Sequence, residues 1–598
     1  MKHIKYFEEK ALYDNYINDD EAILPNVSYT LDTNEVFYNP SNSSTKNYMY
    51  VEALEDDTLV SFKGFVLSNS SYVDPYNTLE YSIDQQTWNT ISADGTATTI
   101  NAGEKLYFRG ECNDIHTTLN SSNMGIGTFA VTKKHNVGGN TMSLLFGDNF
   151  EDKTNLKGYY VFGALFADGN EGKLVSAEKL LLPATTLTNS CYANMFYKCT
   201  SLTTAPQLPV TTLTEYCYDS MFRGCTSLVN APSLPATTLA EDCYYRMFSG
   251  CSSLTSAPEL PATILANSCY KSMFQNCTSL VAAPELPATI LANSCYYSMF
   301  NGCTLLVTAP TLPVTTLAES CYYRMFYGCT SLITPPELPA TKLESWCYSY
   351  MFYGCTSLIT PPELPATTLA DYCYQYMFRD CTSLTTPPKL PATTLADYCY
   401  NSMFYSCTSL TTAPELLATE LAEYCYSGMF YSCTSLTTAP QLPATTLTDN
   451  CYSGMFNGCS KLQSAPQLPA TILANSCYSS MFATCTSLVN APQLPATTLA
   501  NSCYSSMFRG CTSLVNAPQL PVTTLAESCY TYMFNGCTKL NNITMLATNI
   551  SATNCLKYWV SNVASKGTFT KHPDMTSLPT GASGIPSGWE VVDYNVAS

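Results

Sequence analysis

The cysteines of this chain are the side chains most able to do chemistry, because thiols ligate metals, form disulfides and act as nucleophiles. Of the 30 cysteines, all but Cys112 and Cys555 fall into two series, Cys191 to Cys529 and Cys199 to Cys537, each with a period of 26 residues. No C-x2-C pair typical of zinc sites occurs, and each cysteine of a stacked repeat would have two equivalent neighbours. We therefore expect buried thiols that pack as small apolar groups, with a disulfide ladder as the alternative.

Other candidate catalytic groups are scarce. The four histidines, His3, His116, His135 and His572, all lie outside the regular repeats. The sequence contains neither the G-x-S-x-G motif of a nucleophilic serine nor the G-K-[ST] motif of a phosphate loop. We expect no catalytic residue, no metal and no cofactor, so the chain is predicted not to be an enzyme.

Composition and charge exclude two classes of partner. The chain has 598 residues, with 27 Lys+Arg against 46 Asp+Glu and a net charge of −19. This balance disfavours binding along a phosphate backbone, so no nucleic-acid partner is expected. No apolar run reaches the roughly 18 residues of a membrane span, so no membrane insertion is expected. The opening MKHIKYFEEKALYDNYINDD lacks the apolar core of a signal peptide, and we expect synthesis without conventional secretion.

The elements that position the cysteines form a regular repeat. Fourteen units of 26 residues follow one another from Cys191 without insertion or deletion, which predicts a solenoid. In the stretch CYxxMFxxC, the apolar residues fall on one face of a helix. The following TSLxxAPxLPATTL is rich in β-branched residues and proline, as in an extended segment with turns. We predict one short helix and one short strand in each coil of the solenoid.

The repeats differ most at three positions, namely the residue before the first cysteine and the third and sixth residues after it. On a helix, all three point away from the apolar face. These 42 positions carry 13 aromatic residues, and ten of them occupy the 15 positions of the five repeats that begin at Cys321 to Cys425. The candidate receptor-binding residues are Tyr327, Trp346, Tyr350, Tyr353, Tyr372, Tyr376, Tyr398, Tyr405, Tyr424, Tyr431, Arg324 and Arg379.

Clustered exposed aromatic side chains predict a surface on which a glycan or a protein receptor stacks. Asp371 and Asp397, which precede two of the tyrosines, are positioned to add polar contacts. Two other interpretations stay open. In the first, the aromatic cluster is buried against another subunit of a homo-oligomer. In the second, repeat duplication copied the tyrosines and they have no role.

The pattern MFxGCTSLxxAPxLPATTL resembles the BspA-like leucine-rich repeats, which share an F-x-x-C-x-S-L core followed by a Leu-Pro strand. The resemblance covers about residues 165–541 and implies a solenoid of the leucine-rich repeat type. Local departures leave the period unchanged: Leu305 replaces a serine, Asp380 a glycine, Leu417 a proline and Glu420 a threonine.

The flanks carry a second resemblance. The opening YFEEKALYDNYINDDEAILPNVSYTLDTNEVFYNP is similar to N-terminal segments of virion proteins of phages that infect gut Bacteroidales, including the crAss-like group. The β-rich module and the GIPSGW ending are similar to those of surface repeat proteins in the same hosts. We predict a docking segment (1–44), a β-sandwich-like domain (45–150), an N-terminal cap (151–190), the solenoid (191–541) and a C-terminal cap (542–598).

These features lead to one functional hypothesis and two alternatives. The resemblance implies a non-enzymatic phage virion protein that is made in the host cytoplasm. Residues 1–150 would bind other virion proteins, and the solenoid would bind a host surface glycan or protein. The alternatives are a BspA-like adhesin on a bacterial cell surface and a purely architectural virion protein.

Overall fold

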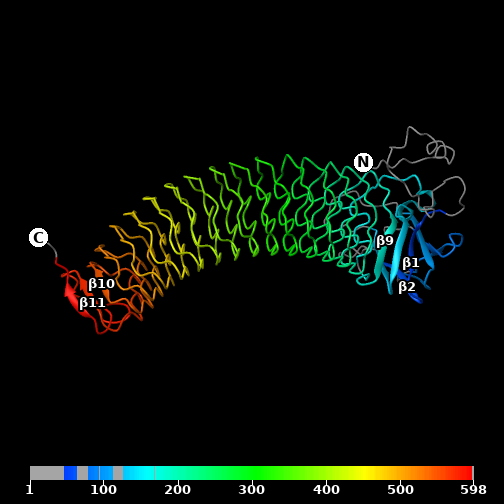
Figure 1. Cartoon of the computed structure of the whole chain (residues 1–598). Helices are drawn as coiled ribbons and strands as arrows, with labels where there is room; N and C mark the ends of the chain where they lie inside the picture. Colours follow the sequence, from blue (N-terminus) through cyan, green and yellow to red (C-terminus); the bar gives the residue numbers. More distant parts are fainter. Residues whose placement is uncertain (1–45, 64–77, 93–94, 112–125, 168, 596–598) are drawn as a thin grey trace.

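The computed structural model describes residues 46–595, except for 64–77, 93–94, 112–125 and 168. The chain forms an arched stack of coils, with a β-sheet region at its N-terminal end and a small sheet at its C-terminal end (Figure 1). The predicted docking segment, residues 1–44, lies outside the described residues, as does Cys112.

A mixed six-stranded sheet and an antiparallel three-stranded sheet make up most of the N-terminal region, which confirms the small all-β region predicted before the solenoid. The six-stranded sheet has the order β4-β3-β6-β1-β8-β9, and the three-stranded sheet has the order β5-β2-β7. The strands are β1 (Met49–Ala53), β2 (Thr58–Lys63), β3 (Thr78–Ser82), β4 (Asn89–Thr90), β5 (Thr96–Ile100), β6 (Lys105–Glu111), β7 (Thr128–Val131), β8 (His135–Asn140) and β9 (Leu174–Leu181).

Alternating side chains of these strands form the core between the sheets. Along β6, Leu106 and Phe108 are fully buried, while the alternate residues Lys105, Tyr107 and Arg109 are half-buried. Phe129 of β7 lies 4.8 Å from Phe108 and 4.9 Å from Phe62 of β2, measured between ring centres. Its ring also stacks on Phe166 at 5.8 Å, so the same core continues towards the first coil.

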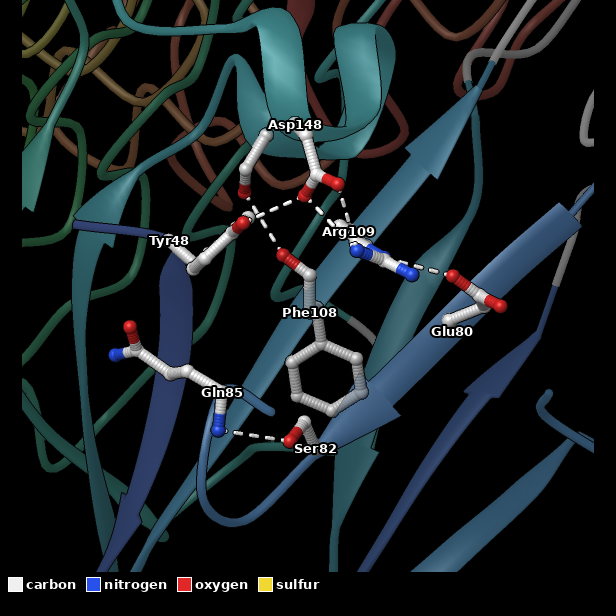
Figure 2. Close-up of polar contacts among 8 residues, drawn as sticks. Tyr48, Glu80, Ser82, Gln85, Phe108, Arg109 and Asp148 are labelled. Carbon is white, nitrogen blue, oxygen red and sulfur yellow. Dashed lines mark hydrogen bonds and ion pairs between the residues drawn. The ribbon is translucent and has the colours of Figure 1, made fainter. Parts of the chain in front are cut away.

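A polar cluster fixes the short helix α2 (Ser143–Phe146) and the 3-10 turn η1 (Gly147–Asn149) to the six-stranded sheet (Figure 2). Arg109 of β6 donates to Glu80 of β3 at 2.7 Å and to both carboxylate oxygens of Asp148 at 2.9 Å. Tyr48 also donates to Asp148. Burial alone would raise the pKa of Asp148, but the hydrogen bonds from Tyr48 and Arg109 lower it.

The six-stranded sheet runs directly into the stack of coils. Its last strand, β9, pairs in parallel with β8 and makes a parallel bridge from Ser176 to Thr204 in the next coil. The core residues of the β region and of the coils form one continuous cluster. The domain limits at residues 150 and 190 stay predictions, because the sheet and the core cross both.

Each coil contains a nine-residue segment, CYxxMFxxC, that we call the turn ribbon; Cys295–Cys303 is one example. Its backbone N–H groups alternate between two kinds of acceptor. Tyr297 donates to Ser294, three residues back, at 3.1 Å, whereas Ser298 donates to Tyr323 in the next coil at 2.8 Å. The same alternation recurs along the stack, so each ribbon is a run of overlapping turns that is hydrogen-bonded to its neighbour.

The predicted short helix is therefore wrong. A helix would use its N–H groups within its own segment, but here every second one leaves the coil. The backbone also has positive φ at every fourth residue, as at Ser294 (φ 56), Ser298 (φ 53) and Gly302 (φ 76). These residues occupy the third position of a turn, where a type II turn requires positive φ. Apolar pairs that recur every four residues fit this ribbon as well as they fit a helix.

The predicted short strand is also wrong in detail. Within the described coils, the proline-rich side makes only isolated parallel bridges, such as Thr212 to Thr238 and Ser256 to Ala282. Proline has no N–H group to donate, so the prolines of APxLP interrupt any longer ladder.

The inward side chains of the ribbons form columns along the solenoid. Tyrosine rings stack from coil to coil at centre distances of 5.7 to 6.2 Å, and phenylalanine rings at 5.3 to 5.8 Å. The 29 described cysteines are free and buried, as predicted, and the second cysteine of a coil donates to a carbonyl of the preceding one, as Cys329 does to Phe300 at 3.1 Å. Burial raises the pKa of Cys303 to about 12, so such thiols stay protonated and unreactive.

A small parallel sheet closes the C-terminal end: β10 (Asn542–Met545), β11 (Thr568–Lys571) and β12 (Glu590–Asp593). Trp559 is fully buried there and lies 6.3 Å from Tyr530, the last ring of the tyrosine column. Its indole N–H donates to Gly584 at 2.9 Å, so the cap covers the last coil without leaving this donor unpaired.

Candidate functional site

The turn ribbons point the three variable positions away from the core, as predicted, although the segment is not helical. All ten candidate aromatic residues are half-buried on the outer side of the ribbons in the coils that begin at Cys321 to Cys425. We call this surface the aromatic face. It comprises Tyr327, Trp346, Tyr350, Tyr353, Tyr372, Tyr376, Tyr398, Tyr405, Tyr424 and Tyr431, together with Arg324 and Arg379.

One column of the aromatic face is a continuous ladder of four stacked rings. Trp346 lies 4.0 Å from Tyr372 between ring centres, Tyr372 lies 4.7 Å from Tyr398, and Tyr398 lies 4.5 Å from Tyr424. The planes of neighbouring rings differ by 6°, 15° and 8°. The structure thus confirms that these four side chains meet.

The other two columns contain stacked pairs and the two arginines. The pairs are Tyr350 on Tyr376 at 4.7 Å, Tyr327 on Tyr353 at 4.4 Å, and Tyr405 on Tyr431 at 4.6 Å. Arg379 replaces a tyrosine between the last two pairs and so interrupts their column.

Arg324 lies among three tyrosine rings. Its guanidinium carbon is 4.8 Å from the ring centre of Tyr350, 5.1 Å from that of Tyr323 and 5.6 Å from that of Tyr327. Cation–π contacts of this kind orient the guanidinium without neutralising its charge. Arg324 forms no ion pair with any residue in the described part of the chain.

Arg379 has a similar setting two coils further along. Its guanidinium carbon is 4.1 Å from the ring centre of Tyr405 and 5.3 Å from those of Tyr353 and Tyr376. Its Nε atom is also 3.5 Å from a carboxylate oxygen of Asp380. Burial and a hydrogen bond to Asp380 raise the pKa of Tyr353 to about 12, so this hydroxyl stays protonated. Because Asp380 lies this close to Arg379, its carboxylate offsets part of the positive charge of the guanidinium.

A column of carboxylates borders the ladder on its other side. Asp371, Asp397 and Glu423 lie two residues before successive first cysteines, and all three are exposed. The backbone N–H of Asp397 donates to Asp371 at 3.1 Å, and that of Glu423 donates to Asp397 at 2.9 Å. Asp371 and Asp397 are the residues predicted from the sequence to add polar contacts, and each already accepts one hydrogen bond from the backbone of the next coil.

Two tyrosines of this surface were missed by the sequence analysis, because they lie in a fourth column, two residues after the first cysteine. Tyr297 stacks on Tyr323 at 4.6 Å. Tyr323 in turn packs its edge against Trp346 at 5.9 Å and lies 5.6 Å from Tyr350. Tyr297 and Tyr323 are 26 residues apart, and this one-period spacing was the sequence feature that could have predicted their contact.

The aromatic face occupies an unfavourable backbone conformation. Trp346 has a φ of 61°, Tyr372 of 60°, Tyr398 of 55° and Tyr424 of 54°, and Tyr350 is similar at 57°. Positive φ costs an ordinary residue roughly 1–2 kcal/mol, and asparagine and glycine accept it best. Most other coils place serine, asparagine or aspartate at the corresponding positions. Backbone preference therefore does not explain these aromatic residues.

The stacking corrects one expectation about how a ligand would bind. Rings that stack face to face cover one another's faces, so the ladder presents ring edges and hydroxyl groups to solvent. A glycan or receptor can stack only where a column ends. Recognition along the ladder would instead use hydrogen bonds and the electropositive ring edges.

A second surface feature lies on the proline-rich side of the coils. A groove of about 660 Å³ is lined by residues of two adjacent coils, including Pro414, Leu417 and Pro440. Leu417 stands where most coils have proline, and its side chain is exposed. Glu415 is the one ionisable residue in the lining, so this groove holds no pair of groups for acid–base chemistry.

Two kinds of site are absent from the residues that the structure describes. No group of three or more histidine, cysteine, aspartate or glutamate side chains is arranged to hold a metal ion. No helix in the described part of the chain has the length and apolarity needed to cross a membrane.

Comparison with known proteins gives one match. The sequence model of the BspA type leucine-rich repeat region, which contains six copies of the repeat, matches residues 189–333, 298–437, 374–514 and 452–563. Together these matches cover more than half of the chain and the whole aromatic face. The searches of curated proteins and of solved structures each found no match.

Proposed function

Because the chain belongs to the BspA-type leucine-rich repeat family, we propose that it is a non-enzymatic binding protein of the surface-adhesion type. In this proposal, the aromatic face contacts a ligand on a cell surface. The observation that carries the proposal is the concentration of closely stacked outer rings, with two arginines among them, in five consecutive coils and the coil before them, in a solenoid whose core is the same throughout.

The cost of the aromatic face supports a role beyond folding. Six of its aromatic residues, Tyr376 (φ 55) included, and Arg324 sit at positive φ, where smaller residues serve in most other coils. Bulky rings suit positive φ less well than serine or asparagine does, and ring stacking returns only about 0.5–1.5 kcal/mol per pair. The coils therefore gain little stability from these residues, and local strain of this kind clusters at functional sites.

The finer proposal concerns where the protein works. We propose a phage virion protein that is anchored through residues 1–150 and made in a host cytoplasm. The resemblance of the opening segment to virion proteins of Bacteroidales phages supports it. The free, buried cysteines are what a reducing cytoplasm favours. Family membership suggests a surface- or adhesion-type repeat protein and does not choose between a virion and the other candidate, an adhesin on a bacterial cell surface.

Binding of the fluorescently labelled full chain to a panel of gut Bacteroidales cells tests the main proposal. The ladder variant changes Trp346, Tyr372, Tyr398 and Tyr424 to serine. The control variant changes Tyr216, Tyr532 and Tyr197 to serine, because these half-buried tyrosines occupy the same three kinds of position outside the aromatic face.

We expect strain-selective binding that falls at least tenfold in the ladder variant and less than twofold in the control. Unchanged binding by a folded ladder variant would overturn the proposal. Light scattering of the native chain and the ladder variant distinguishes a ligand site from a subunit interface. If the native chain is an oligomer and the ladder variant is not, the aromatic face is a subunit interface. Mass spectrometry of purified particles and of cell envelopes separates the virion from the bacterial surface.

A further inference from the structure

We propose that the ligand of the aromatic face is an acidic polysaccharide that runs along the solenoid axis, with anionic groups on Arg324 and Arg379. This inference rests on the proposed function, and it adds the chemical class of the ligand and the residues that recognise its charge.

The two arginines are prepared for binding an anion. Three tyrosine rings surround each guanidinium, at 4.8 to 5.6 Å for Arg324 and 4.1 to 5.3 Å for Arg379. Such packing orients a planar group that binds carboxylate or sulfate through two parallel hydrogen bonds. Because the side chains are already ordered, little entropy is lost on binding. Arg324 has no carboxylate partner among the described residues, so its charge is available.

The spacing of the arginines favours a polymer with regularly placed charges. Arg324 and Arg379 lie two coils apart. Adjacent strands of a sheet are about 4.8 Å apart, so two coils advance roughly 10 Å along the axis. The ring distances in the ladder, 4.0 to 4.7 Å, agree with this advance per coil. An extended polysaccharide with one anionic group in every second sugar has a comparable repeat.

The exposed chemistry of the ladder favours sugars over a protein partner. A protein interface is usually anchored by aromatic or arginine side chains in desolvated pockets. Here the ring faces are covered by neighbouring rings, so the ladder offers rows of hydroxyl groups and ring edges instead. These rows run parallel to the axis for four coils, which matches a linear ligand that repeats hydrogen-bonding groups along its length.

The carboxylate border favours sugars over nucleic acid. Asp371, Asp397 and Glu423 are exposed beside the ladder, and Asp371 and Asp397 each accept a hydrogen bond from a backbone N–H of the next coil. Sugar hydroxyls can donate to them while the anionic groups of the same chain lie on the arginine side. The net charge of −19 repels both kinds of polyanion, so the distinction is the hydroxyl groups, and DNA has few hydroxyl donors for these carboxylates.

The test measures binding of the full chain to four probes: polygalacturonate, chondroitin sulfate, neutral dextran and single-stranded poly(dT). The test variant is Arg324→Gln with Arg379→Gln. The matched control is Arg246→Gln with Arg509→Gln, because these arginines occupy the same two columns outside the aromatic face. Circular dichroism verifies that both variants are folded.

We expect binding to at least one acidic polysaccharide that weakens with added salt. It should fall at least tenfold in the test variant and less than twofold in the control. Equal binding to poly(dT), a preference for dextran, no binding to either acidic probe, or acidic binding that the test variant retains would each overturn the inference.

The proposed function is judged separately, by cell binding of the ladder variant. If that variant loses cell binding while neither acidic probe binds, the function stands and the ligand is a neutral glycan or a protein. If the ladder variant keeps cell binding, the function itself fails.

Discussion

Two sets of stacked aromatic rings run along the same coils and differ in what the fold requires of them. The inner columns of tyrosine and phenylalanine continue through all the repeats, with ring centres 5.3 to 6.2 Å apart. The aromatic face occupies five coils, and the rings within its columns lie 4.0 to 4.7 Å apart. Coils such as those from Cys451 and Cys477 keep the inner columns but carry serine, glycine, asparagine and alanine outside. The inner rings therefore belong to the fold, whereas the outer rings are an addition to it.

The largest expected effect is unfolding at alkaline pH, which the buried cysteines of the coils cause. Burial raises the pKa of Cys295 and of Cys303 to about 12 from an ordinary 9.0. The unfolded chain therefore releases thiol protons above pH 9 while the folded chain keeps them, so stability is full below pH 9 and falls from pH 9 to 12. We expect the urea midpoint, measured under reducing conditions, to drop steeply above pH 9. A midpoint that stays constant from pH 8 to 11 would contradict this.

The next effect compares an inner and an outer ring of the same coil. Phe378→Ala removes a fully buried ring and should lower the free energy of unfolding by about 3–5 kcal/mol. Tyr376→Ser, two residues earlier on the outer side, should lower it by less than about 1.5 kcal/mol, the upper worth of a stacked pair. Urea unfolding with hydrogen exchange in the Cys373 coil measures both. Equal losses would mean that the aromatic face is part of the folding core.

A smaller effect follows from building the outer column elsewhere. Ser476→Tyr with Ser502→Tyr places two tyrosines at neighbouring coils with positive φ. The native serines already bear the Cβ cost of positive φ, so only the bulk of the new rings adds to it and offsets one stacking gain of about 0.5–1.5 kcal/mol; the double variant should be unchanged or destabilised by less than about 1 kcal/mol. If thermal and urea unfolding instead show a gain, stability alone would explain the native ladder.

The smallest effect concerns the carboxylate border. Asp397→Asn keeps an oxygen that accepts the N–H of Glu423, so stability should change by less than about 0.5 kcal/mol. Removing one exposed negative charge should strengthen binding of an acidic polysaccharide about twofold at low salt, with no change at high salt. Glu527→Gln, in the same column far from the aromatic face, is the control and should leave binding unchanged.

The sequence was sufficient to predict the core of the coils but not their backbone. Positions such as Cys347, Tyr348, Met351, Phe352 and Cys355 are buried as expected. The same pattern fits a helix and a ribbon of turns, and the deciding factor is whether N–H groups bond within the coil or to the next one. Small or polar residues at every fourth position were the local signal for positive φ and hence for turns.

The candidate site was predictable in its columns but not in its contacts. The period alone placed Trp346, Tyr372, Tyr398 and Tyr424 on one outward line. Which ring faces stay open depends on side-chain torsions and on the distance between coils, neither of which the sequence states. The same is true of the tyrosines around Arg324, one of which, Tyr323, lies in a column where the next four coils of the aromatic face carry serine, glutamine or asparagine.

The alternating hydrogen bonds of the ribbons also decide how the molecule responds to a pull on its two ends. Every second N–H of a ribbon bonds to the next coil, so several bonds share the load at each interface, while the interfaces themselves bear it in series. The weakest interface gives way first and releases one 26-residue coil, about 90 Å of extended chain. A solenoid built this way extends in steps under load. Each step lowers the tension on the bond between the protein and its ligand, so the bond lasts longer in flowing liquid.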